Sequence, residues 1–175
     1  MSQPLLDRTL NVSGAPECFR NEYDGLDKRT SRSASPNKDV FSLGCVFSEA
    51  LVWSTLGAKG VEAYRLMRRA STEKIAELRR TAYSGCFHDG ERVLSAVKLM
   101  HEEVRTSCGD ELPVLSDLAL ITEDMLSSDS VRPSAPEVRR RLLRVIRDAV
   151  STRDISKAGF ELTILTVQRR VSTVS

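Results

Sequence analysis

The chain has 175 residues, which is enough for one compact domain with an apolar core. Its 41% hydrophobic and 29% charged residues are ordinary for a soluble globular protein. The formal net charge of +2 is too small an excess for a nucleic-acid-binding protein, so we expect no nucleic-acid partner. The longest apolar stretch, residues 40–56, is interrupted by polar side chains and falls short of the roughly 20 apolar residues of a membrane span. We therefore expect no membrane segment.

The four cysteines are Cys18, Cys45, Cys86 and Cys108, and they form no C-x-x-C pair. Zinc sites need closely spaced ligands, and the two histidines do not supply them, so the sequence predicts no metal site. The N-terminus lacks the apolar run of a signal peptide. We expect an intracellular, cytoplasmic protein with reduced thiols, and we place Cys45 in the core.

Residues 1–38 are rich in turn-forming residues, and we expect irregular structure there. Their basic, serine-rich run at 29–37 is either a phosphorylation site or a solvated loop, the more common use of such runs. From Asp39, which suits a helix N-cap, the pattern becomes helical. Apolar residues on nearly every side of this helix predict a place in the middle of the core. The helix is expected to end near Gly57 or Gly60.

Four amphipathic segments follow, with apolar residues at spacings of three and four. They cover residues 61–80, 91–107, 114–127 and 134–150. The last segment opens with the capping box S-A-P-E, whose serine and glutamate satisfy free N–H groups at a helix start. The basic tail, 151–175, could form a strand at 160–164 but is expected to be loosely ordered. The sequence thus predicts one mainly α domain, at 39–150, around a buried central helix.

Three short motifs give the chain a resemblance to a known family. Ala15-Pro16-Glu17 matches the A-P-E that closes the activation segment of protein kinases. Residues 39–46, D-V-F-S-L-G-C-V, resemble the D-V-W-S-L-G-C that opens the long buried helix of the kinase C-terminal lobe, or C-lobe. Residues 132–135, R-P-S-A, resemble the R-P-S/T-A that precedes the last conserved helix of that lobe. In this order, over about residues 9–150, they resemble the C-lobe of a eukaryotic protein kinase of the fungal serine/threonine kinase-like type.

The resemblance implies structural roles for Ala15, Pro16, Glu17, Asp39, Gly44 and Arg132. It pairs Glu17 with Arg132 in a buried ion pair, and losing one partner of such a pair costs about 3–5 kcal/mol. Two exposed charges, worth about 0–1 kcal/mol, are the alternative. Asp39 would keep only its N-cap role, because the catalytic loop that it serves in kinases is absent. Gly44 would allow a close approach of the backbone at the same place.

The residues that a kinase uses to transfer phosphate do not occur in this sequence. There is no G-x-G-x-x-G, no H-R-D-x-x-x-x-N and no D-F-G. No Ser-His-Asp or Cys-His arrangement can be argued from the pattern either. Because the A-P-E begins at position 15, we expect no N-terminal lobe upstream. We therefore expect no catalytic, cofactor-binding or metal-binding residue in this chain, although ATP and Mg²⁺ serve the intact family.

Three functions stay open at this point, and whether the chain is an enzyme is open with them. The first is a truncated kinase-like protein that is inactive alone, although its family phosphorylates serine and threonine in proteins. The second is a helical interaction module whose segment 61–80 meets an acidic protein partner, with a solvated basic face as the alternative. The arginines of that segment are Arg65, Arg68, Arg69, Arg79 and Arg80. The third is a remnant, or the product of a mis-called gene start of an active kinase, with apolar surface exposed. Substrate, pathway and oligomeric state do not follow from the sequence.

Overall fold

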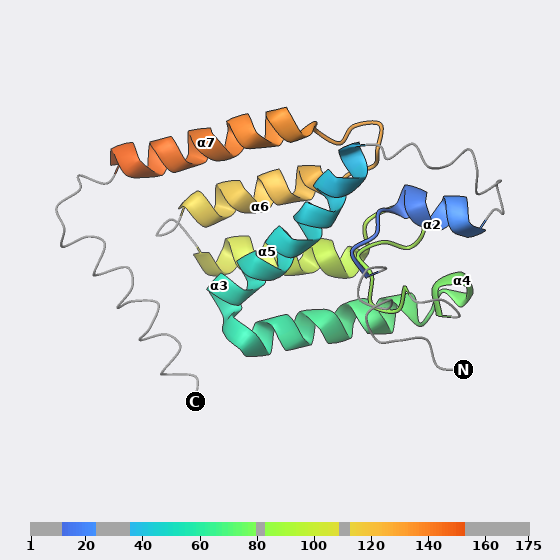
Figure 1. Cartoon of the computed structure of the whole chain (residues 1–175). Helices are drawn as coiled ribbons and strands as arrows, with labels where there is room; N and C mark the ends of the chain where they lie inside the picture. The colour runs from blue at the N-terminus through green and yellow to red at the C-terminus, as the bar shows by residue number, and fades with distance from the viewer. Residues whose placement is uncertain (1–11, 24–35, 80–82, 109–112, 153–175) are drawn as a thin grey trace.

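The computed structural model describes residues 12–23, 36–79, 83–108 and 113–152. Its helices are α2 (Pro16–Tyr23), α3 (Pro36–Thr72), α4 (Ala76–Arg79), α5 (Ser95–Cys108), α6 (Pro113–Met125) and α7 (Ala135–Thr152) (Figure 1). Within these described ranges there is no strand, and one isolated bridge joins His88 to Val93. The predicted mainly α class is therefore confirmed. The tail beyond Thr152, with its possible strand, lies outside the described residues.

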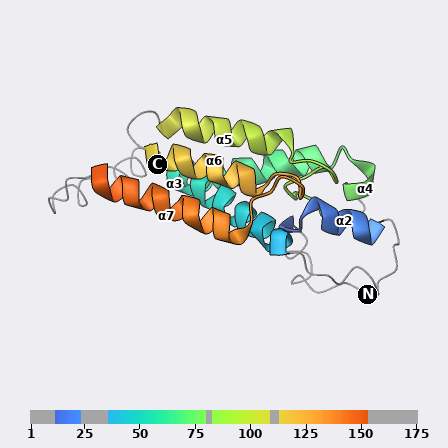
Figure 2. The ribbon, with the colours of Figure 1, turned by 90° about the horizontal axis from the view of Figure 1, so that it is seen from above.

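The helix α3 organises the fold. It packs mainly against α5 and α6 and touches α7 more lightly. Figures 1 and 2 show α5, α6 and α7 running side by side, with α3 beside them and α2 and α4 together at one end. The main apolar cluster joins residues of α3 to residues of α5 and α6, among them Phe41, Val97 and Ala119. The core thus lies on one side of α3.

The bounds of α3 differ from the expectation at both ends. The helix begins at Pro36, so Asp39 lies in its first turn and is not the N-cap. Proline fits there because the first N–H groups of a helix have no partner within it. At Gly57 the backbone takes φ 69° and ψ −167°, a conformation that essentially only glycine adopts. The predicted end near Gly57 is a sharp break, after which a second helical half continues without a loop to Thr72.

The first half of α3 is buried on one face only. Phe41, Cys45 and Val52 are buried there. On the other face Leu43 is 44% exposed, Val46 58% and Trp53 65%. The expectation of a helix buried on nearly every side was therefore wrong for this face. By length and composition α3 could also cross a membrane, a test that the core helix of a soluble protein passes as well, and the absence of a membrane segment stays a prediction.

The remaining elements follow the predicted order with shifted ends. The segment predicted at 91–107 becomes helical only at Ser95, because residues 88–93 form the bridged turn. The segment predicted at 61–80 stops at Thr72, and α4 follows as a separate turn. The helix α7 begins directly after Ser134, whose carbonyl accepts the N–H of Val138 at 3.0 Å. The expectation of irregular structure over residues 1–38 was wrong at Pro16–Tyr23, where α2 forms, because eight residues are too few to show a helical period.

Candidate functional site

An ion pair joins the start of α2 to the loop before α7. The guanidinium of Arg132 meets the carboxylate of Glu17 through Nη1–Oε1 at 2.7 Å and Nη2–Oε2 at 3.2 Å. The side chain of Arg132 is 0% exposed and that of Glu17 is 16% exposed. Burial alone would raise the pKa of Glu17, but the hydrogen bond and charge of Arg132 outweigh it and hold the pKa below its usual value. The carboxylate is therefore ionised, and the pair is fully buried on the side of Arg132 and partly buried on the side of Glu17.

Arg132 also holds main-chain groups of two other segments. Its Nη1 donates to the carbonyl of Asn37 at 2.8 Å, and its Nε donates to that of Ser127 at 3.0 Å. Its guanidinium lies 5.0 Å from the ring centre of Phe41. One side chain thus ties together α2, the start of α3 and the end of α6. We call this set of contacts the clamp, and its two charged members are the motif residues Glu17 and Arg132.

The other motif residues lie around this clamp without joining it. Ala15 and Pro16 are buried, and the Ala15 carbonyl accepts the N–H of Cys18 at 2.9 Å as α2 begins. Gly44 is buried where a Cβ would meet the Met125 Cβ at 3.0 Å, so it does permit a close approach, and the approaching element is α6. Asp39 is exposed and is not one of the residues that form the clamp.

An apolar surface lies on the open side of α3. Its residues, Leu43, Val46, Ala50 and Trp53, recur at helical spacing on one face and are all exposed. We call them the α3 stripe.

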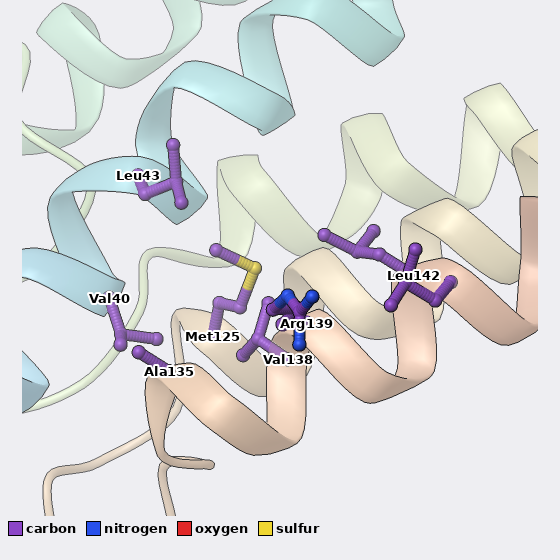
Figure 3. A pocket seen from close by; sticks show the side chains of 8 residues that line it. Val40, Leu43, Met125, Ala135, Val138, Arg139 and Leu142 are labelled. Atoms are coloured by element: carbon purple, nitrogen blue, oxygen red, sulfur yellow. The ribbon is translucent and has the colours of Figure 1, made fainter.

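At its Leu43 end the stripe meets an apolar groove of about 290 Å³ between α3, α6 and α7. Figure 3 shows Val40 and Leu43 on one side of this groove, Val138 and Leu142 on the other, and Met125 between them. Such a surface fits apolar side chains of another polypeptide.

A cluster of charges joins the two halves of α3. Arg65 contacts both carboxylate oxygens of Glu49, with Nε–Oε1 at 3.1 Å and Nη2–Oε2 at 2.5 Å. Arg68 reaches the same carboxylate through Nη2 at 2.5 Å. Burial raises the pKa of Glu49, but these two guanidinium groups together lower it below its usual value. The pairs fix the angle between the two halves of α3 across the break at Gly57.

Arg68 does not belong to an exposed basic face, which corrects the expectation for segment 61–80. It is 2% exposed and is among the largest fully buried side chains. Its guanidinium carbon lies 3.8 Å from the ring centre of Phe87 and 4.5 Å from that of Tyr64. The sequence carried a signal for this, because Arg68 follows Tyr64 by four positions on the apolar face. Arg65, Arg69 and Arg79 are exposed, and Arg80 lies outside the described residues.

The structure also contains a buried polar network that the sequence did not predict. The hydroxyl of Ser48 lies 2.7 Å from Nε2 of His101 and 2.7 Å from the hydroxyl of Tyr64. On the far side of the ring, Nδ1 of His101 lies 3.4 Å from Oε1 of Glu123. The order Ser48, His101, Glu123 is that of a hydrolytic triad, but Ser48 and His101 are both 0% exposed. No substrate reaches a hydroxyl in that position, so the network has a structural role and links α3, α5 and α6.

The network could not be deduced from the sequence, since Ser48 and His101 lie on different helices 53 positions apart. Burial lowers the pKa of His101, which keeps the ring neutral near pH 7. None of the four cysteines forms a disulfide, and Cys45 is buried as predicted. In the part of the chain that the structure describes, no three His, Cys, Asp or Glu side chains come close enough to hold a metal ion.

Comparisons with models of protein families, with curated proteins and with solved structures find no match to this chain.

Proposed function

We propose that this chain is a helical unit of the protein kinase C-lobe type that acts by binding another polypeptide and transfers no phosphate by itself. The observation that carries the proposal is the ion pair of Glu17 with Arg132. The resemblance implies this contact between the A-P-E and R-P-S-A motifs, which lie 115 positions apart. Two short motifs that occurred by chance would give their charged members no reason to meet in a largely buried, bidentate pair.

The α3 stripe supports the binding role. An exposed apolar patch of this kind marks a contact surface or an aggregation hazard. The kinase resemblance implies that this side of the long helix faces the other lobe and the catalytic loop. We therefore propose that the occupant is a polypeptide segment that supplies those missing parts. It belongs either to the same polypeptide or to a separate chain.

Phosphate transfer tests the first half of the proposal. We expect the isolated chain to phosphorylate no protein substrate in the presence of Mg-ATP, because the groups that position phosphates and metal in kinases do not occur in its sequence. Phosphate transfer to a protein by the isolated chain would contradict the proposal. The buried Ser48 network offers no substitute, since it has no access to substrate.

The size of the endogenous protein tests the second half. An antibody against residues 134–150 would detect a band near 19.5 kDa if the cell makes this chain alone. Its occupant is then a separate protein, which co-purification with the antibody identifies by a kinase-type N-lobe. A band of ~30–40 kDa, the size of a domain with both lobes, would place the occupant in the same polypeptide. Trp53 is the single tryptophan, so its emission should shift to the blue when the stripe is covered.

A second candidate surface is the exposed basic part of segment 61–80. With Arg68 buried and Arg65 paired to Glu49, this surface is smaller than the sequence suggested. An acidic protein partner there stays a proposal, and charge reversal at Arg69 and Arg79 should abolish its binding. Unchanged binding would count against this candidate.

A further inference from the structure

A charged pocket lies where the second half of α3 faces the loop at 83–87. Its volume is about 350 Å³. Its polar lining consists of Ser13, Glu49, Arg65, Arg68, Arg69 and Ser84. We call it the arginine pocket. Three arginines stand there against one glutamate, so the lining carries an excess of two positive charges.

Arg68 gives the pocket a fixed charge that the protein only partly compensates. Ring stacking on Phe87 and Tyr64 holds its guanidinium in place. Only Nη2 has a partner, the Glu49 carboxylate, while Nε and Nη1 are buried with none. An arginine keeps its proton in proteins, so the protein cannot remove the charge of Arg68 or its unpaired N–H donors by deprotonation. The site therefore favours an anion beside Arg68.

Arg65 and Arg69 supply the donors that a ligand can reach. Both side chains are exposed, and both line the pocket beside Arg68. Arg65 already contacts Glu49, and that one carboxylate is shared between Arg65 and Arg68. A second carboxylate would leave one positive charge uncompensated. A phosphate monoester carries about −1.5 to −2 charges and three acceptor oxygens, which matches the excess.

We propose that the arginine pocket is a binding site for a phosphate group, with Arg68 as the fixed charge and Arg65 and Arg69 as the contacting donors. The group comes either from free phosphate or from a phosphorylated side chain. The proposal goes beyond the kinase-type function. Val46 of the α3 stripe also lines this pocket, but the proposal holds or fails separately, because its donors are the arginines Arg65, Arg68 and Arg69 and the stripe is apolar.

The test is calorimetric titration of the whole chain with inorganic phosphate and with O-phosphoserine, at constant ionic strength set by chloride. We expect saturable binding, weakened about tenfold for each of Arg65→Gln and Arg69→Gln. Arg140→Gln removes an exposed arginine of α7, far from the pocket in the sequence, and should leave the affinity unchanged. Glu49→Gln should tighten binding, because it removes the competing carboxylate, whereas mere loss of folding would weaken it.

Each outcome decides the proposal. Binding of O-phosphoserine with no binding of serine supports the site and assigns a phosphorylated side chain as its source. Equal affinity for inorganic phosphate supports the site with free phosphate as its ligand. Absence of saturable binding would overturn the proposal. So would equal affinity in wild type and in the Arg65→Gln/Arg69→Gln double variant, provided that the thermal unfolding of both shows a folded chain.

Discussion

Nη1 of Arg132 lies 2.7 Å from Oε1 of Glu17 and 2.8 Å from the carbonyl oxygen of Asn37. This one nitrogen therefore joins the first turn of α2 to the first turn of α3. Since the side chain of Arg132 is fully buried, its guanidinium has lost its hydrogen bonds to water. These contacts replace them. The clamp makes the position of α2 depend on a residue more than a hundred positions away.

Removing the carboxylate should destabilise the fold. Glu17→Gln keeps the shape of the side chain but leaves the buried charge of Arg132 without a counter-charge, and we expect a loss of about 3–5 kcal/mol in the free energy of unfolding. Urea denaturation measures it. The double variant Glu17→Gln/Arg132→Met should lose less than the sum of the single variants, because neither charge is then left alone.

The exposed pair of Arg140 with Glu137 on α7 is the matched control. Arg140→Gln should change the free energy of unfolding by about 0–1 kcal/mol. A cost for Glu17→Gln no larger than that of this control would mean that the clamp behaves as an exposed pair. The role given to Glu17 and Arg132 would then be wrong.

Acid should destabilise the fold through His88. Burial lowers the pKa of His88 to about 4 from its ordinary 6.5, among the rings of Phe19, Phe41 and Tyr83. Below pH 6.5 the His88 ring binds a proton in the unfolded chain, whereas in the folded chain it stays neutral until the pH falls to about 4. The free energy of unfolding should thus be unaffected by His88 above pH 6.5 and fall by about 3 kcal/mol as the pH drops towards 4.

Urea denaturation between pH 4 and 7 measures this slope, and NMR titration of the ring gives the pKa directly. His88→Asn should remove the slope, because an asparagine side chain does not titrate in this range. The variant should still fold, since its amide oxygen can accept the N–H of Gly90 that Nδ1 of His88 accepts at 3.0 Å. His101 adds a slope of the same sign, so the comparison is between wild type and variant. A ring that titrates near 6.5 would contradict the prediction.

Local patterns in the sequence predicted where helices form better than they predicted which helix faces are buried. The capping box at Ser134 places the start of α7 correctly, because capping depends only on neighbours in the chain. The exposed face at Val46 and Trp53 was misjudged, since an apolar helix carries no sign of whether a partner covers each side. The contact of Ser48 with His101 arises only from the packing of α3 on α5, which no local pattern encodes. The clamp was foreseen through a family motif, not through spacing.

The break in α3 should resist substitution of Gly57. A side chain there has open space, since nothing lies within 4 Å of the Cβ position, but φ of 69° with ψ of −167° strains any L residue. Gly57→Ala should therefore cost about 1–3 kcal/mol in the free energy of unfolding, through the backbone alone. Thermal or urea denaturation measures it. Stabilisation by about 0.4–1 kcal/mol, the usual result where alanine fits, would mean that the helix has no such break.

The α3 stripe should be replaceable without loss of stability. Val46→Ser and Trp53→Ser change side chains that are more than half exposed, so the free energy of unfolding should stay within about 0.5 kcal/mol of wild type. The same double variant should bind less of a dye that fluoresces on apolar surfaces, and it should self-associate less in sedimentation. Association with the proposed occupant should be lost, since the apolar contact area is gone.

Leu99 provides the control for that experiment. It is 62% exposed, but its neighbours along α5, Lys98, Glu102 and Glu103, are exposed and charged. A single apolar side chain of this kind is normal on a protein surface, so Leu99→Ser should change neither dye binding nor self-association. If Leu99→Ser acts as strongly as the double variant, exposure alone explains the dye signal, and the stripe is no contact surface. If only the double variant acts, Val46 and Trp53 form part of one contact surface.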